Sequence, residues 1–363
     1  MFRSSVRILT STMALAGMML ALAACNKAVD TKATAPVPAA AACDRQCLIS
    51  ATDAYVAAIV AHDPSKAPLA DKVVFVENLT KLQPGEGLWK AVVTAPGTFA
   101  IHVPDEINHT AGYLAMMTYM APPPAPQGMS PEQRAEFAAK NAPAEQPVVV
   151  ALRLKFDDTG KIMEAEHLLS GVREAQMVNL ATLRPGILTE IAADQRLSHD
   201  KLIAIGATYY DALDDNNGEL APFADDCERH ENGMITASST PAPQAPAIPG
   251  VAPRPKVARD CKGQLNSGTF QYIARIENRR VFAADPVTGL TMGLSHFRHP
   301  MDNLPYTVRN LDGSTSQATK ETFNFAPFDL PAAHIFKIGA DGQMHEIEAM
   351  GFTTTYNSPT GWE

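Results

Sequence analysis

The sequence lacks the short motifs that indicate nucleophilic, phosphate-binding or zinc-dependent chemistry. It contains no G-x-S-x-G, no H-E-x-x-H, no phosphate loop and no dinucleotide fingerprint. It also lacks a run of basic residues, and its formal net charge is −9. Because an acidic surface repels phosphate backbones, nucleic acid is not expected as a partner. No cofactor and no metal ion is expected.

Long apolar runs are also missing, and a short one lies at the start of the chain. Residues 8–24 are mostly apolar, follow Arg3 and Arg7, and end before Cys25. The run is shorter than the ~20 residues that a membrane span needs, although an uncleaved anchor stays open as an alternative. The sequence Leu22-Ala-Ala-Cys25 resembles a bacterial lipobox.

That resemblance implies a signal peptide at 1–24, cleavage before Cys25 and a lipid on the Cys25 sulfur. The mature protein would then be tethered to a membrane on the periplasmic side or at the cell surface. Loss of the two leader arginines takes the net charge from −9 to about −11. Residues 25–42 are rich in Ala, Thr, Pro and Lys and have no periodicity, which predicts a disordered tether.

An internal repeat divides the rest of the chain. A block at 67–78, Ala-Pro-Leu-Ala-Asp followed by Glu-Asn, returns at 221–232 as Ala-Pro-Phe-Ala-Asp followed by Glu-Asn, an offset of 154 residues. Further blocks recur in the same order, and they predict a duplicated domain. We place a first domain at 43–171, a connector at 172–197 and a second domain at 198–363.

Both copies predict the same elements. Each opens with a helix, at 48–62 in the first copy and at 200–214 in the second, where Ser198 is the predicted N-cap. A short strand follows, and then several longer segments with strand character. A helix followed by an antiparallel sheet predicts an α+β fold. The second copy also gains a proline-rich loop at 238–255.

This order of elements resembles the nuclear transport factor 2-like superfamily, also called SnoaL-like. The resemblance rests on the element order, on Tyr55 and Tyr209 at matching helix positions, and on the repeated block. The segments 226–233 and 330–334 further resemble a duplicated, exported branch of uncharacterised function. The resemblance implies two tandem cone-shaped domains, each a leading helix packed on a curved antiparallel sheet, whose interior holds a small molecule or is filled. Members include enzymes, ligand binders and scaffolds, so the fold leaves the chemistry open.

Four cysteines follow Cys25, an even number in a compartment that permits disulfides. Cys227 and Cys261 are additions to the second copy and bracket its proline-rich loop, so we predict that they pair. Cys43 and Cys47 would then pair one helical turn apart, near the edge of a comfortable Cα separation. The other pairings, and a zinc site built from all four, stay open as alternatives.

Polar residues of the second copy replace apolar residues of the first. Arg229 stands where the first copy has Phe75, and His334 stands where it has Leu152. Leu152 belongs to an apolar strand face of period two, so His334 is predicted to point into the second domain. An inward imidazole needs a polar partner and, beside a carboxylate, can act as a general base. We therefore expect the functional cavity in the second domain.

In this hypothesis His334 is the acid/base residue, and Glu231 or Glu346 orients it. The residues expected to bind the ligand are Arg229, His230, Tyr210, His296 and Arg275. The alternative is that His334 is a structural histidine of the core. His296 and His299 do not predict a metal site, because side chains three positions apart on a strand face opposite sides.

Two classes of function remain. The first is a lyase, isomerase or hydrolase without a cofactor that uses acid/base groups of the second domain. The second is a non-catalytic lipoprotein that binds a small molecule, another envelope protein or a second copy of itself. The difference between the two copies favours the first class, whereas the acidic surface and the missing catalytic motif favour the second.

Overall fold

The computed structural model describes residues 43–123, 125–126, 129–240, 256–323 and 325–363. The chain divides into the units 1–39 and 40–363, and every element described below belongs to the second unit. The predicted leader, Cys25 and the tether lie outside the described residues, as does 241–255 of the proline-rich loop. No helix of the described part has both the length and the apolar character needed to cross a membrane.

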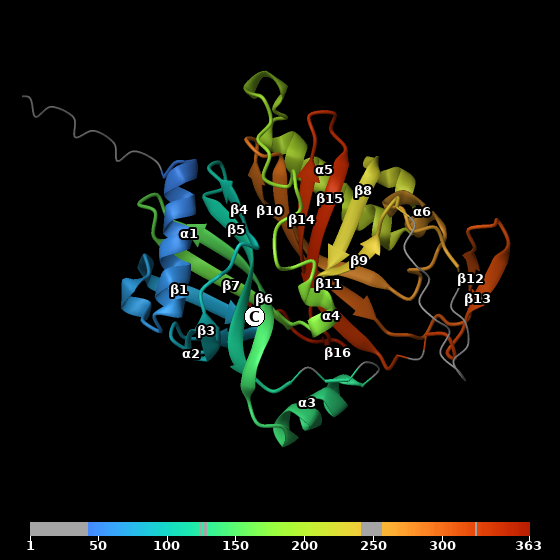
Figure 1. Ribbon diagram of the computed structural model, residues 1–363, viewed down its shortest axis with the longest axis horizontal. Helices are drawn as coiled ribbons and strands as arrows, with labels where there is room; N and C mark the ends of the chain where they lie inside the picture. The colour runs from blue at the N-terminus through green and yellow to red at the C-terminus, as the bar shows by residue number, and fades with distance from the viewer. Residues whose placement is uncertain (1–42, 124, 127–128, 241–255, 324) are drawn as a thin grey trace, which may run out of the picture. The chain divides into compact units, whose positions relative to one another are not determined.

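The first half of the described chain forms a seven-stranded sheet covered by a leading helix (Figure 1, blue to green). The strand order is β2-β1-β7-β6-β5-β3, and β4 also pairs with β5. The elements are α1 (Arg45–Val60), β1 (Leu69–Glu77), β2 (Thr80–Leu82), α2 (Leu88–Ala91), β3 (Val92–Thr94), β4 (Ala100–Asp105), β5 (Thr110–Ala121), α3 (Pro131–Lys140), β6 (Ala144–Phe156) and β7 (Ile162–Gly171).

The second half forms another seven-stranded sheet, in the order β10-β11-β14-β15-β8-β9 with β16 paired to β14. The connector holds the short helix α4 (Glu174–Met177). The remaining elements are α5 (His199–Asp214), β8 (Phe223–Glu231), β9 (Met234–Ala237), α6 (Cys261–Asn266), β10 (Arg275–Asp285), β11 (Leu290–His299), β12 (Tyr306–Arg309), β13 (Thr315–Ala318), β14 (Phe328–Ile338), β15 (Met344–Gly351) and β16 (Thr354–Thr355).

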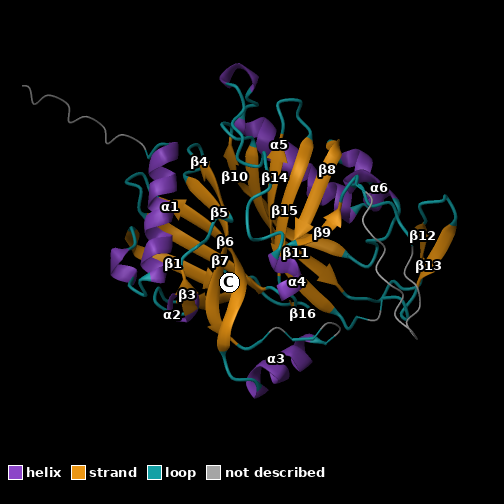
Figure 2. Ribbon diagram, viewed as in Figure 1, coloured by secondary structure: helices purple, strands orange, loops and turns teal. Residues whose placement is uncertain are grey.

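Six strands of each sheet follow the same order, whereas the seventh strand is β3 beside β5 in the first sheet and β16 beside β14 in the second. The fold is therefore mixed α and β with two sheet bodies (Figure 2), and the segments 43–171 and 198–363 that contain them are called the first and the second domain below. The helices α1 and α5 begin and end 154 residues apart, and so do β1 and β8. One strand pair in each sheet is parallel, β1 with β7 and β8 with β15. The sequence predicted wholly antiparallel sheets. The parallel pair forms because almost a whole domain, not a tight turn, joins its two strands.

Side-chain caps determine where the helices begin. Ser198 accepts a hydrogen bond from the backbone N–H of Lys201 at 3.3 Å, as predicted for the N-cap of α5. Ser130 and Gln133 form the capping box that starts α3. Asp44 caps α1 in the same way and starts it three residues before the predicted position. The local sequence therefore sets the first residue of each leading helix.

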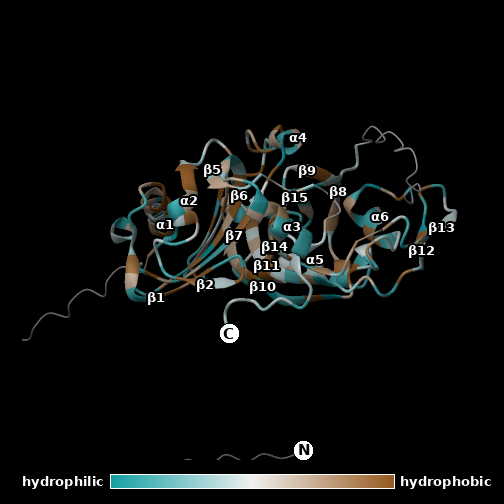
Figure 3. Ribbon diagram, turned by 90° about the horizontal axis from the view of Figure 1, so that it is seen from below, coloured by the Kyte–Doolittle hydropathy of each residue, from teal (hydrophilic) through white to brown (hydrophobic). Residues whose placement is uncertain are grey.

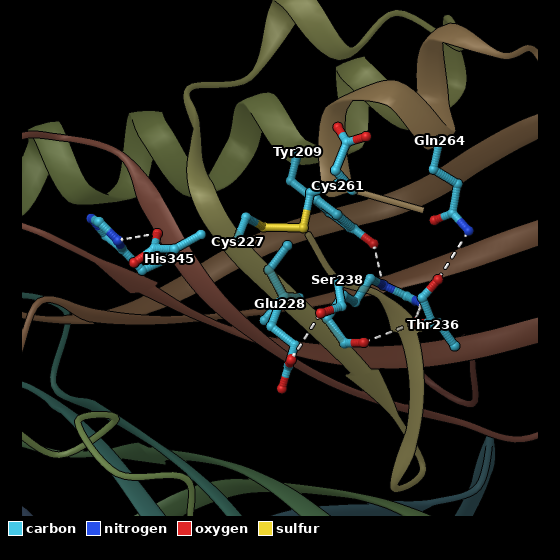
Figure 4. The surroundings of a disulfide bond; sticks show 12 residues. Tyr209, Cys227, Glu228, Thr236, Ser238, Cys261, Gln264 and His345 are labelled. Carbon is cyan, nitrogen blue, oxygen red and sulfur yellow. Dashed lines mark hydrogen bonds and ion pairs between the residues drawn. A yellow bond between two sulfur atoms is a disulfide. The ribbon is translucent and has the colours of Figure 1, made fainter. Parts of the chain in front are cut away.

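Both predicted disulfides are present in the structure. Cys43–Cys47 closes the first turn of α1 with a Cα separation of 5.2 Å, and Cys227–Cys261 joins β8 to α6 with a Cα separation of 5.9 Å (Figure 4). Both distances are ordinary for disulfides. The second bond spans 34 residues, and closing a loop of this size contributes roughly 3–4 kcal/mol.

The two sheets share a buried apolar core on the faces turned away from α1 and α5. Apolar residues, brown in Figure 3, run along strands of both sheets. Two ion pairs also join the halves, and they are made by equivalent residues. Arg45 of α1 binds Asp285 of the second half, and His199, the equivalent residue of α5, binds Asp105 of the first. A Cβ on Gly112 would lie 2.5 Å from Sδ of Met292, which holds the equivalent position in the second sheet.

Candidate functional site

Four polar side chains form a hydrogen-bonded network inside the second domain. Tyr209 projects from α5, and Arg229 and Glu231 share one face of β8. Arg229 donates from Nε to the hydroxyl of Tyr209 at 2.8 Å, from Nη2 to Glu231 at 2.7 Å, and from Nη1 to Thr236 at 2.6 Å. Burial alone would lower the pKa of Arg229, but Tyr209 and Glu231 outweigh it. The pKa is therefore raised, and the guanidinium is charged.

His334 lies on β14 beside this network. Its side chain is 1% exposed, and Nδ1 shares a hydrogen bond of 3.3 Å with the hydroxyl of Tyr210. The described residues make no other hydrogen bond to the ring. Burial, and then the charge of Arg229, hold the pKa of His334 well below its ordinary value. The imidazole is therefore neutral.

A cavity of about 90 Å³ opens among these side chains, large enough for several water molecules. Its disulfide edge is shown in Figure 4, which labels the wall residues Tyr209, Cys261 and Gln264. The polar residues of the wall are Tyr209, Arg229, Glu231, Gln264, Tyr272, His299 and His334. The larger apolar residues of the wall include Leu213, Phe223, Leu265, Phe270, Phe297, Leu330, Ile347 and Met350.

The cavity forms because the second domain has small residues where the first domain has large ones. By strand register, the lining residues Ala237, Ala332 and Ala349 stand at the places of Leu82, Val150 and His167. In the first domain Trp89 also fills the interior. Its side chain is 1% exposed and meets Tyr55 edge to face, with ring centroids 5.3 Å apart.

The first domain has a matching polar network. The hydroxyl of Tyr55 bonds to Nε2 of His167 at 2.9 Å, and Nδ1 of His167 bonds to Glu77 at 3.1 Å. His167 lies opposite Glu77, where the second domain has Ala349. Tyrosine and glutamate are therefore kept in both domains. The side chain that bonds to both of them is His167 of β7 in the first domain and Arg229 of β8 in the second.

Five predicted site residues do not line the cavity. Tyr210 bonds to the wall residue His334 but is not itself part of the wall. His230 and Glu346 project from the faces of β8 and β15 opposite the cavity. His296 lies on the far face of β11, 3.1 Å from Ser358, and Arg275 is half exposed and pairs with Glu277. Glu346 therefore does not orient His334, and Glu231 binds Arg229 instead.

His299 is a cavity residue that sequence reasoning missed. The structure confirms that His296 and His299 face opposite sides, and His299 takes the side of the cavity. Its ring stacks on Phe328 with centroids 4.0 Å apart, and burial lowers its pKa to about 4. Phe297, two positions earlier on β11, lines the same wall. Because residues two apart on a strand share a face, the alternation along β11 could have identified His299.

A carboxylate cluster lies on the opposite face of the second sheet. Arg184 of the connector places Nε 3.0 Å from Glu348 and 3.2 Å from Glu346, and Nη1 lies 3.8 Å from Glu228. His230 bonds to Glu228 at 2.7 Å. Burial raises the pKa of Glu348 to about 7, although the charge of Arg184 opposes this. One arginine faces three carboxylates, so the cluster retains a proton more readily than an exposed pair would.

Residues 195–351 match the model of a protein family described as a domain of unknown function, DUF8021. No curated protein matches the chain. The matched segment runs from just before α5 to the end of β15, and it includes every polar residue of the cavity wall. The family description assigns no activity to the site.

Proposed function

We propose that the second domain is a binding module for a small, largely apolar molecule. The observation that supports this most is a hollow at the place that Trp89 fills in the first domain. The polar groups of Arg229, Glu231 and His334 around an unfilled cavity make the domain less stable than a packed apolar interior would. Such destabilising features often occur at functional sites. The charges of Arg229 and Glu231 cancel and His334 is neutral, so the site favours an uncharged ligand.

A catalytic acid/base step at His334 has less support. A general base must accept a proton near the working pH, and burial beside Arg229 holds the pKa of His334 far below that range. Glu231 is bound by Arg229 and not by the imidazole. The cavity therefore supports binding better than it supports a lyase, isomerase or hydrolase reaction.

The proposal includes the resemblance to the nuclear transport factor 2-like, or SnoaL-like, superfamily. A cone-shaped domain of that superfamily would place a small-molecule cavity between its leading helix and its sheet. The cavity between α5 and the second sheet supports this assignment, and so does the repeated order of elements in the two halves.

Filling the cavity tests the binding function. Ala349→Leu places an isobutyl group where His167 stands in the first domain. Metabolites from an extracytoplasmic library that raise the melting temperature of the wild type are expected not to raise that of Ala349→Leu. The variant itself is expected to melt at the same or a higher temperature, because it fills a hollow.

The control for this test is Ala135→Leu on the exposed face of α3, which should respond to the same compounds as the wild type does. Equal responses in the wild type and in Ala349→Leu would contradict the proposal. So would a library in which no compound stabilises the wild type.

We further propose that the protein is a lipoprotein held at a membrane through Cys25. The lipobox-like leader supports this, and the two disulfides suit an oxidising compartment. Cys25→Ser is expected to leave the precursor unprocessed, with a higher mass on a gel, because the sulfur that receives the lipid is gone. Cleaved protein that still sediments with membranes in this variant would contradict the lipid anchor.

A further inference from the structure

We propose that the ligand of the second-domain cavity is a compact aromatic molecule with one hydrogen-bond donor. This inference rests on the binding function proposed above. Its template is the first domain, whose own chain places an aromatic ring and a donor at the equivalent positions.

Trp89 occupies in the first domain the place that the cavity occupies in the second. It packs in one core cluster with Phe75, Val150 and Leu152, whose equivalents Arg229, Ala332 and His334 line the cavity. The plane of its ring stands at 88° to that of Tyr55, with centroids 5.3 Å apart. Tyr55 is the equivalent of Tyr209, so the cavity presents the tyrosine ring against which the indole packs.

The walls of the cavity suit one aromatic ring. Besides Tyr209 they contain Phe297 and the stacked imidazole of His299, and aromatic rings favour edge-to-face or offset contacts with one another. The cavity measures about 90 Å³, which excludes a ligand with two fused rings.

The polar contact comes from Glu231. In the first domain both oxygens of Glu77 accept the backbone N–H of Leu88, at 3.1 and 3.0 Å, and so hold the residue that precedes Trp89. In the second domain Asp260 caps α6, accepting the N–H of Gly263 at 2.6 Å.

Glu231 therefore accepts no hydrogen bond from the first backbone N–H groups of α6. Among the described residues, the carboxylate of Glu231 accepts one hydrogen bond, from Arg229 to Oε2. Oε1 is available to accept an O–H or N–H group of a ligand, as Glu77 accepts the N–H of Leu88.

Three probes of similar size separate the two requirements. Phenol has the ring and the donor, toluene has the ring alone, and cyclohexanol has the donor alone. In calorimetric titrations of the full mature chain, phenol is expected to bind at least ten times more tightly than either of the others. Ala349→Leu is expected to abolish phenol binding, and Ala135→Leu to leave it unchanged. Glu231→Gln is expected to weaken phenol at least fivefold and to leave toluene unaffected.

The alternative outcomes are distinct. Equal binding of cyclohexanol and phenol would overturn the aromatic requirement, and equal binding of toluene and phenol would overturn the donor. Equal phenol binding by the wild type and Ala349→Leu would place the ring outside the cavity and overturn the inference. If no probe binds but library metabolites stabilise the wild type and not Ala349→Leu, the inference fails and the binding function stands. If neither probes nor metabolites distinguish these two proteins, both fail.

Discussion

Arg229→Phe is expected to lower the free energy of unfolding by about 2–3 kcal/mol, because it removes the hydrogen bonds of a charged network that is largely but not fully buried. The change leaves Tyr209, Glu231 and Thr236 without the donor that each now has. The phenylalanine itself fits the fold, since Phe75 stands at the equivalent place in the first domain. Urea denaturation of the wild type and the variant at neutral pH measures the loss.

A second substitution makes this prediction specific. In the first domain His167 bonds to tyrosine and glutamate beside Phe75, with ring centroids 4.6 Å apart. Adding Ala349→His to Arg229→Phe is therefore expected to recover at least half of the lost free energy. A double variant no more stable than the single one would show that the two networks are not equivalent. Arg275→Phe, at a half-exposed position, is the control and should change stability little.

The stability of the wild type is expected to fall as the pH rises through the region where Glu348 ionises. Its pKa in the folded state is raised by burial from 4.5 to about 7, so the folded state binds this proton more tightly than the unfolded state does. The stabilisation is complete below pH 4.5 and is lost by about pH 7. A shift of this size corresponds to about 3 kcal/mol.

Glu348→Gln removes this titration. The free energy of unfolding of the variant relative to the wild type is therefore expected to rise between pH 5 and pH 8, as measured by urea denaturation at each pH. The titratable and charged groups that face Glu348 are Arg184, Glu228, His230 and Glu346. Glu166→Gln, at the equivalent position of β7 and paired with Arg280, controls for the loss of an arginine-bound carboxylate. Parallel curves for the wild type and Glu348→Gln would rule out Glu348 as the titrating group.

The repeat and strand parity were enough to find part of the site in the sequence. The comparison of His334 with Leu152, and of Arg229 with Phe75, led to two side chains that line one cavity. The exchange of His167 for Ala349 was visible at the same offset as that of Leu152 for His334. This exchange would have indicated that Arg229 takes over the hydrogen-bonding role of His167, which lies on the neighbouring strand in the first domain.

Other parts of the site depended on geometry that the sequence does not contain. Glu346 was chosen because it is a carboxylate of the second copy, but it alternates with Ile347, and only the sheet shows which of the two faces the cavity. The parallel pairing of β8 with β15 depends on how the chain crosses the sheet, which residue patterns do not record. Arg184 lies in the connector, where no repeat was available for comparison.

The contact between Gly112 and Met292 favours the pairing of a first domain with a second domain. Two second domains would bring two methionine side chains into a space with room for one, and two first domains would leave an unfilled hole between two glycines. Tandem fusion keeps the protruding and the recessed surface at equal concentration within every molecule. The first domain thereby serves as a permanent, dedicated partner of the second.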